Sequence, residues 1–261
     1  PYVVPGFVDL HVHGWGGHDA MGGPAALDGM ARALLRRGVT SFLPTAVAAG
    51  LETLARFADE VRDWIPGAPG DGAVPLGFDL EGPFLAPSRH GAHDPALLRD
   101  PASVGAAELA PLLDGLRVIT VAPELPGALA LIGRLASRGI VVSLGHSEAT
   151  LDEARAGYAA GARSTTHLFN AMSGVDHRRP GLAVTALADD AVAVELIADG
   201  HHVHPGLWPI VARAKPADRL VLVSDALAAA GTVPEGGVGT TTIGGLAVEI
   251  RGGRATLAGT A

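Results

Sequence analysis

The chain has 261 residues, of which 48% are apolar and 18% are charged, so it can bury a sizeable core in one large domain or two small ones. The formal net charge of -8 and the lack of any lysine- or arginine-rich run argue against binding to nucleic acid. The chain contains no cysteine, which excludes disulfides and thiolate metal sites, and its longest apolar runs are only of strand length. Because no signal peptide is visible either, we expect a soluble, cytoplasmic protein that does not enter a membrane.

Strand-like and helix-like runs alternate along the chain. The expected strands cover, in order, residues 5–14, 39–47, 74–84, 118–122, 140–144, 164–168, 192–197 and 220–223. The helices expected between them cover residues 25–37, 51–64, 104–113, 127–138, 151–160, 182–188 and 207–214. The glycine- and threonine-rich tail that begins at Gly231 predicts a long loop or short hairpins.

This alternation indicates an α/β fold. Eight strands separated by seven helices is the order of a (β/α)8 barrel, of the TIM-like type, whose last helix is missing. A doubly wound sheet shows a similar alternation, but no Gly-x-Gly-x-x-Gly turn follows the first strand and no Walker-type loop occurs. The chain opens without Met almost directly on a core strand and ends at Ala261 without a closing helix. We therefore expect one catalytic barrel domain over residues 1–261, excerpted from a longer chain.

The first strand carries the strongest chemical signal. Side chains alternate along a strand, so Asp9, His11 and His13 share one face. Two histidines at the carboxyl end of a strand, backed by a carboxylate, look like half of a metal site. A surface strand with one polar face is the alternative, but the flanking glycines favour a functional loop. We expect Asp9 to orient one of the ligand histidines.

Ionisable side chains also stand at the carboxyl ends of other strands. The complete set comprises His11, His13, Glu81, His146, His167 and Asp225. In a barrel, the carboxyl ends of all strands meet at one mouth, and burying so many ionisable groups without a cation would be costly. Histidine and carboxylate ligands suit Zn2+, Fe2+, Mn2+ or Co2+, and their number allows two ions bridged by Glu81. Such a site activates water, and Asp225 could pass the proton of that water to a leaving group.

Six motifs resemble those of the amidohydrolase superfamily and, within it, the N-acetylglucosamine-6-phosphate deacetylases. They begin at Pro5 (Pro-Gly-Phe-Val-Asp-Leu-His-Val-His-Gly), Glu81 (Glu-Gly-Pro-Phe), Gly145 (Gly-His-Ser-Glu-Ala-Thr), Thr166 (Thr-His-Leu-Phe-Asn-Ala-Met), Ala198 (Ala-Asp-Gly-His-His-Val) and Val223 (Val-Ser-Asp-Ala). The Glu-Gly-Pro-Phe and His-Leu-Phe-Asn-Ala-Met runs are quite specific to these deacetylases. Most of the superfamily places a carboxylated lysine where this chain has Glu81.

The resemblance implies hydrolysis of the N-acetyl group of N-acetylglucosamine 6-phosphate to glucosamine 6-phosphate and acetate. It implies one or two divalent ions per subunit, with zinc expected first and iron, manganese, cobalt or cadmium as alternatives. One ion would be bound by Glu81, His146 and His167. The first-strand histidines leave room for a second ion, which they would share with Glu81 and Asp225. Asp225 also matches the catalytic acid/base of the family.

The resemblance also implies substrate-binding residues. His93 and His202 would lie near the sugar and the scissile amide, and Asn170 and Ala171 near the phosphate end. A phosphate-binding arginine matches Arg178, although its neighbour Arg179 is an alternative and the two could also be an ordinary solvated pair. In this family that arginine can come from a partner subunit, which predicts a homodimer. The remaining candidates are expected to be loop residues or residues that support the ligands, and not ligands themselves: His18, His90, His177, His201 and His204.

Two other functions remain open at this stage. A related hydrolase, such as a cyclic amidase or deaminase, would act on a different C–N bond at the same kind of centre. Asn170, Ala171 and the Arg178 loop favour a phosphorylated sugar instead. A non-catalytic metal-binding barrel is the third hypothesis. Asp225 argues against it, because a structural zinc site is usually closed by four ligands and keeps no spare base. Family members also carry a β-sandwich built from segments on both sides of the barrel, which we do not expect here.

Overall fold

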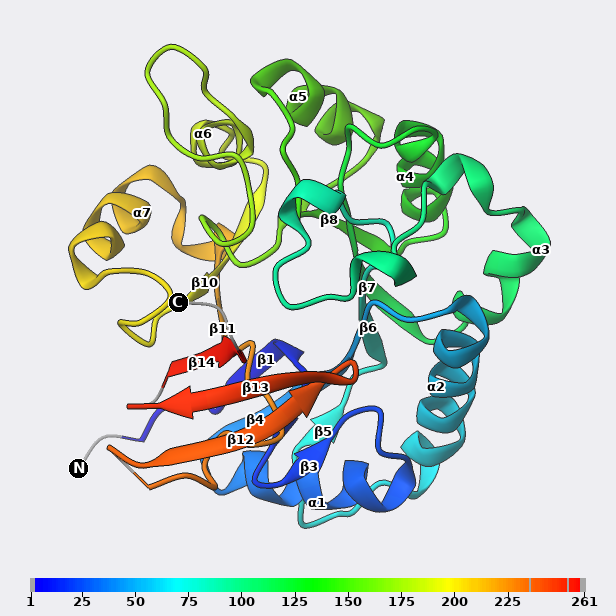
Figure 1. Ribbon diagram of the computed structural model, residues 1–261, viewed down its shortest axis with the longest axis vertical. Coiled ribbons are helices and arrows are strands. Elements are labelled where there is room, and N and C mark those ends of the chain that lie inside the picture. Colours follow the sequence, from blue (N-terminus) through cyan, green and yellow to red (C-terminus); the bar gives the residue numbers. More distant parts are fainter. Residues whose placement is uncertain (1–2, 235, 253, 259–261) are drawn as a thin grey trace.

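Parallel strands form the centre of the protein, and helices surround them (Figure 1). The computed structural model describes residues 3–234, 236–252 and 254–258. The central strands are, in their order around the sheet, β1 (Phe7–Val12), β4 (Val39–Val47), β6 (Phe78–Glu81), β7 (Leu116–Val121), β8 (Val141–Leu144), β9 (Ser164–Thr165), β10 (Ala193–Ile197) and β11 (Leu220–Val223). Each pairs in parallel with the next. The N–H of Asp225 donates to the carbonyl of His11 at 2.9 Å and so joins the end of β11 to β1. The expected (β/α)8 barrel is confirmed.

Helices fill the connections between consecutive barrel strands. They are α1 (Pro24–Leu35), α2 (Leu51–Trp64), α3 (Ala106–Leu109), α4 (Ala128–Ala136), α5 (Leu151–Ala160), α6 (Leu182–Ala188) and α7 (Trp208–Ala214). α2 shows how they attach, because its Phe57 packs edge-on against Phe78 of β6, with ring centroids 5.7 Å apart. Burying such apolar side chains contributes about 1.5–3 kcal/mol each and holds the strands in place. In the described part of the chain, no helix is long and apolar enough to cross a membrane.

The structure corrects three of the expected elements. The third strand is divided into β5 (Val74–Pro75) and β6, because Gly77 between them has a φ of 128°, which interrupts the extended backbone. The sixth strand ends at Thr165, so that His167 lies in the turn after it. The helix expected over 104–113 is a single α-helical turn, α3, followed by a 3-10 turn, because Pro111 interrupts the helical hydrogen bonds.

Two antiparallel sheets extend the barrel. A small hairpin, β2 (Gly14–Trp15) with β3 (His18–Asp19), lies in the connection after β1. The tail forms the three strands β12 (Val238–Ile243), β13 (Leu246–Arg251) and β14 (Arg254–Leu257), which we call the flap. This was one of the two arrangements expected for the tail. The expectation that the chain is an excerpt of a longer protein depends partly on its two ends. Pro1 and residues 259–261 lie outside the described residues.

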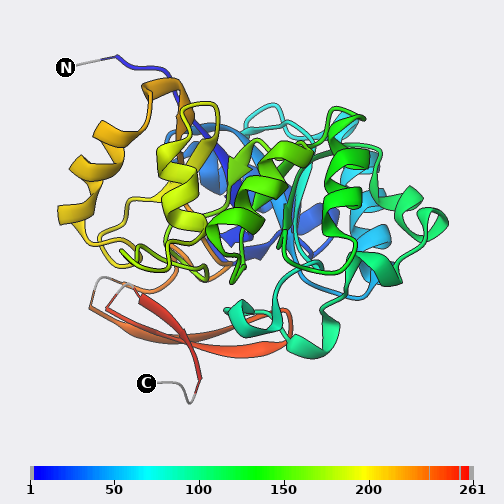
Figure 2. The ribbon, with the colours of Figure 1, turned by 90° about the horizontal axis from the view of Figure 1, so that it is seen from above.

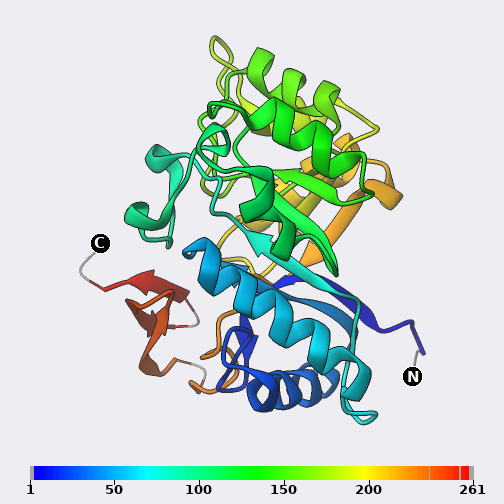
Figure 3. The same ribbon diagram turned by 90° about the vertical axis from the view of Figure 1, so that its right-hand side faces the viewer.

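The flap covers one side of the barrel. Figures 2 and 3 show it on the side opposite the beginning of β1, beside the segment that follows β6. Ile243 and Val248 of the flap are buried against Val47 at the carboxyl end of β4, and Ala92 packs against the same cluster. The flap therefore forms a wall over the mouth where the barrel strands end.

Candidate metal centre

The six side chains that stand at strand ends in the sequence meet at the barrel mouth. Within this set, two groups have ligand atoms that lie within 4.8 Å of one another. The first group is Glu81, His146 and His167, and the second is His11, His13, Glu81 and Asp225. All are buried except Asp225, whose side chain is 20% exposed. These groups contain the same residues as the two ion sites that the family resemblance implies, and Glu81 belongs to both.

Glu81 lies at the centre of the cluster because its two oxygens face different histidines. Its Oε1 is 2.9 Å from Nε2 of His146 and 2.8 Å from Nε2 of His167. Its Oε2 is 3.0 Å from Nε2 of His13 and 3.1 Å from Nε2 of His93. One carboxylate can therefore serve both groups, with one oxygen for each.

The backbone at three of these residues is unusual. His146, His167 and Asp225 have φ angles of 47°, 28° and 49°, a region that residues other than glycine seldom adopt. Each such residue costs about 1–3 kcal/mol and is found mostly at functional sites. The turns are held by the main chain: the N–H of Asn170 donates to the carbonyl of His167, and that of Ala86 to the carbonyl of His146. The strained turns direct these side chains into the mouth.

The orientation of the imidazoles fits a cation. Nδ1 of His146 is 2.7 Å from the carbonyl oxygen of Arg89, and Nδ1 of His13 is 3.1 Å from that of Thr45. A carbonyl oxygen only accepts hydrogen bonds, so each Nδ1 carries the proton, and in the neutral ring the lone pair is on Nε2. The Nε2 atoms of His146 and His167 lie only 3.0 Å apart, a contact that needs a proton or a cation between the two nitrogens. The donor set therefore fits a divalent metal ion bound by nitrogen and carboxylate oxygen.

The charges of the cluster agree with this interpretation. Burial lowers the pKa of His146 to about 4, so this imidazole is neutral at pH 7, as binding to a metal requires. Burial alone would lower the pKa of His13, but hydrogen bonds to Asp225 and Glu81 raise it to about 9. Burial would raise the pKa of Asp225, but the neighbouring His11 and His13 lower it to about 2. Without a metal ion, protons on the first-strand histidines balance the carboxylates, and a bound ion would displace those protons.

Two buried carboxyl groups beside the cluster were missed by the sequence reasoning. Glu195 on β10 has its Oε2 3.3 Å from Nδ1 of His11. Asp79 on β6 is fully buried, its side-chain oxygens have no hydrogen-bond partner in the described structure, and burial raises its pKa to about 8. Glu195 is the one acidic residue in the apolar strand β10, and Asp79 lies between Phe78 and Leu80 in β6. The costly placement of an acidic residue in a buried strand was the signal available in the sequence.

The expectation for Asp9 is wrong. Its Oδ1 accepts hydrogen bonds from the backbone N–H groups of Ser224, at 3.1 Å, and of His11, at 3.4 Å. Asp9 therefore ties β1 to the end of β11 and does not hydrogen-bond an imidazole ring. The carboxylate that approaches the ring of His11 belongs to Glu195.

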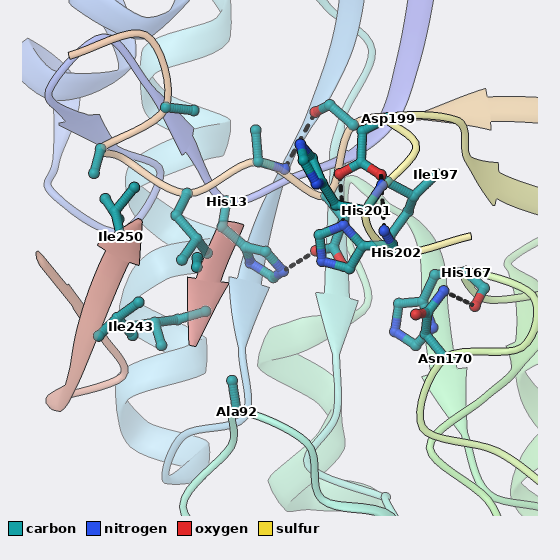
Figure 4. Close-up of a pocket in the computed structure, with 18 of the residues that line it drawn as sticks. His13, Ala92, His167, Asn170, Ile197, Asp199, His201, His202, Ile243 and Ile250 are labelled. Carbon is teal, nitrogen blue, oxygen red and sulfur yellow. Dashed lines mark hydrogen bonds and ion pairs between the residues drawn. The ribbon is translucent and has the colours of Figure 1, made fainter. Parts of the chain in front are cut away.

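A cavity of about 990 Å³ opens in front of the cluster. Figure 4 shows His13, His167 and the pair Asp199–His202 around this space, with Ile243 and Ile250 of the flap on one side. Nδ1 of His202 is 2.7 Å from Oδ2 of Asp199. His201, which we expected to be a loop or supporting residue and not a ligand, also lines the cavity.

The comparisons with known proteins agree with the fold and with the centre. The model of the Amidohydrolase family matches residues 2–245. The chain belongs to the amidohydrolase family. This family is metal-dependent, in agreement with the two ligand groups at the mouth.

Relatives with known names are more specific. The chain is 41% identical to an N-acetylgalactosamine-6-phosphate deacetylase of Escherichia coli O157:H7 over 96% of this chain and 66% of that protein. It is 39% identical to the N-acetylglucosamine-6-phosphate deacetylase of Danio rerio over 99% of this chain and 65% of that protein. The chain thus spans about two thirds of the length of the curated relatives it matches.

Solved structures of such enzymes superimpose closely on the chain. A mutant N-acetyl-D-glucosamine-6-phosphate deacetylase from Mycobacterium smegmatis, in complex with N-acetyl-D-glucosamine-6-phosphate, gives a TM-score of 0.88 at 39% identity, covering 98% of this chain and 66% of that one. The enzyme from Thermotoga maritima gives 0.88 at 36% identity, covering 97% and 67%.

The residues of this amidohydrolase that were expected to bind the substrate lie at different distances from the metal ligands. His93 is buried with its Nε2 against Glu81, so it lies at the ligands themselves. Asn170 and Ala171 line the cavity, and the Nδ2 of Asn170 donates to the carbonyl of His167 at 3.2 Å. Arg178 and its neighbour Arg179 are exposed in the loop before α6 and are not among the described lining residues. Their role stays a prediction.

Proposed function

We propose that the protein containing this chain is a metal-dependent amide hydrolase that converts N-acetyl-D-glucosamine 6-phosphate to D-glucosamine 6-phosphate and acetate. The observation that carries the proposal is the meeting of two ligand groups on Glu81 at the mouth of a cavity, one of which contains the Asp225 carboxylate. Relatives named as deacetylases of amino-sugar phosphates, at 36–41% identity, supply the substrate class. The 41% match to an N-acetylgalactosamine-6-phosphate deacetylase favours that related sugar as a second candidate substrate.

The proposed centre takes one or two divalent ions, with zinc first and iron, manganese, cobalt or cadmium as alternatives. Glu81, His146 and His167 would hold one ion, and His11 and His13 would hold the second together with Glu81 and Asp225. A bound ion would polarise the amide carbonyl and lower the pKa of a coordinated water molecule.

Asp225 is the proposed general acid/base. Its pKa of about 2 keeps it ionised at neutral pH, so it can take a proton from the attacking water. It then delivers this proton to the amide nitrogen as the C–N bond breaks and the new C–O bond leaves acetate behind. His93 and His202 would contact the sugar and the scissile amide, and Asn170 and Ala171 the phosphate end.

We further propose that the active unit is a homodimer in which Arg178 reaches the phosphate from the partner subunit. The support is its exposed position in a loop outside the cavity of its own chain, which leaves it available to a neighbour. A phosphorylated sugar is a metabolite of the cell interior, which supports a cytoplasmic location.

The test is acetate release by the full-length protein from both phosphorylated amino sugars and from unphosphorylated N-acetylglucosamine, before and after chelation. Fast release that requires the phosphate, stops on chelation and returns with zinc is expected. If the protein binds metal but releases no acetate from any of these sugars, the proposal fails. The activity would then be that of another amidohydrolase, such as a cyclic amidase or deaminase.

Replacing Arg178 with alanine tests the phosphate assignment. Loss of a charge-assisted contact to phosphate should raise the KM for the phosphorylated sugar about 10- to 100-fold with little change in kcat. Arg179→Ala is the matched control, because the backbone N–H groups of both arginines donate to Oδ1 of Asp176 in the same loop and are kept in both variants. Equal effects of Arg178→Ala on phosphorylated and unphosphorylated sugars, or a larger effect of Arg179→Ala, would contradict the assignment.

A further inference from the structure

Glu195 is a buried carboxylate that belongs to neither ligand group. It lies on β10, and its side chain is 4% exposed. Its Oε2 is 3.3 Å from Nδ1 of His11 and accepts the backbone N–H of His167, also at 3.3 Å. One oxygen of Glu195 thus contacts a residue of each ligand group, through Nδ1 of His11 and the backbone N–H of His167. A charge buried this deeply is costly, so contacts to both groups imply a role at the centre.

The geometry of His11 explains what this contact does. Its Nε2 faces the other members of the second ligand group. It is 3.3 Å from Nε2 of His13, 3.5 Å from Oε1 of Glu81 and 3.6 Å from Oδ1 of Asp225. For Nε2 to offer its lone pair to a cation, the proton of the neutral ring must be on Nδ1. A buried Nδ1–H needs an acceptor, and among the described residues Glu195 is the one within hydrogen-bond distance.

Asp79 provides an internal comparison. It is also buried on the same side of the ring, but its Oδ2 is 3.9 Å from Nδ1 of His11, beyond hydrogen-bond distance. Neither of its oxygens has a hydrogen-bond partner in the described structure. Two acidic groups therefore approach one imidazole, and only Glu195 is placed to fix its proton and its orientation.

We propose that Glu195 is a positioning residue that holds His11 for the second metal ion, the one shared by His11, His13, Glu81 and Asp225. This rests on the metal centre of the proposed function. Histidine ligands typically donate their other ring N–H to such a partner, and removing that partner typically lowers metal affinity about 10- to 100-fold. The contact of Glu195 with the backbone of His167 keeps the two ion positions in a fixed relation.

Zinc binding to the full-length protein tests this role without relying on turnover. Zinc per chain is measured after dialysis, and the dissociation constant of each ion is measured by competition with a chromophoric chelator. Wild type should hold two zinc ions, and Glu195→Met should keep the first ion while binding the second about 100-fold more weakly. Glu195→Gln retains an oxygen acceptor without the charge, and should weaken the second ion about tenfold. Asp79→Asn should bind both ions as wild type does.

The outcomes separate this inference from the proposed function. If both Glu195 variants bind the second ion with wild-type affinity, or if Asp79→Asn weakens it as much as they do, the positioning role is overturned. A purely structural role would lower the melting temperature of the metal-free protein and leave second-ion affinity unchanged. If Glu195→Met does not fold, the isosteric Glu195→Gln decides alone. A wild type that binds one zinc ion yet releases acetate would overturn this inference and leave the deacetylase function standing.

Discussion

Replacing Asp225 with asparagine is expected to lower kcat for acetate release about 10²- to 10⁴-fold, the usual contribution of a positioned general acid/base. Asparagine has nearly the shape of aspartate but cannot accept and return a proton at neutral pH. The backbone N–H of Asp225 that joins β11 to β1 is unaffected by the change, so the barrel should stay closed. Its side chain is not part of the Glu81–His146–His167 group, and the ion held there should remain.

The measurement is kcat together with zinc content and melting temperature for the same preparation. A fall in kcat with both zinc ions retained identifies Asp225 as the proton carrier. A variant that keeps its zinc and turns over at nearly the wild-type rate would rule this role out. A variant that loses the zinc ion shared with His11 and His13 would show instead that Asp225 acts mainly as a ligand, which its 3.3 Å contact with Nε2 of His13 also permits.

The barrel and the ligand sets could be predicted because their signals are local. A strand of apolar residues that ends in a histidine or a glutamate, as at Glu81, places the polar group at the mouth without any knowledge of long-range contacts. The periodicity of α2 likewise gives its bounds, Leu51–Trp64, as the structure has them. Such features are determined by residues that lie within a few positions of one another in the sequence.

The features that were missed depend on contacts between distant segments. Glu195 and His11 are 184 positions apart, and nothing in the sequence near either residue pairs them. The partner of Asp9 is the backbone N–H of Ser224, which donates to its carboxylate and becomes its neighbour only when the barrel closes. Closure itself selects which carboxylate meets which imidazole, and side-chain alternation along one strand cannot determine this.

The contacts of His93 likewise depend on distant segments. It lies in the loop after β6, and the substrate role that the family resemblance implies for it stays a prediction. In the structure it is buried with Nε2 3.1 Å from Oε2 of Glu81. Its Nδ1 accepts the backbone N–H of Ala48 at 3.2 Å, so in the neutral ring the proton is on Nε2 and points at the carboxylate. A histidine in this state donates to Glu81, and it does not compete with the other imidazoles for a cation.

Replacing Glu81 with glutamine should remove both metal ions. The amide oxygen binds metal weakly, the amide nitrogen not at all, and both ligand groups lose the one residue they share. Zinc per chain after dialysis should fall below about a tenth of the wild-type value, since one group keeps only the imidazoles of His146 and His167 and the other only His11, His13 and Asp225. Because a bound ion contributes several kcal/mol to catalysis and about 1.4 kcal/mol is tenfold in rate, acetate release should fall at least about 10³-fold.

Glu124→Gln is the matched control for this change. Glu124 is a half-buried glutamate in the segment after β7. Its oxygens accept from Oγ of Ser147, at 2.7 Å, and from the backbone N–H of Glu148, at 2.6 Å, and it belongs to neither ligand group. It should keep both zinc ions and lose only a little stability. If Glu81→Gln retained one zinc ion with full affinity, the two groups would be independent sites, and Glu81 would not bridge them. Retention of both ions would mean that the histidines and Asp225 suffice, and the central place given to Glu81 would be wrong.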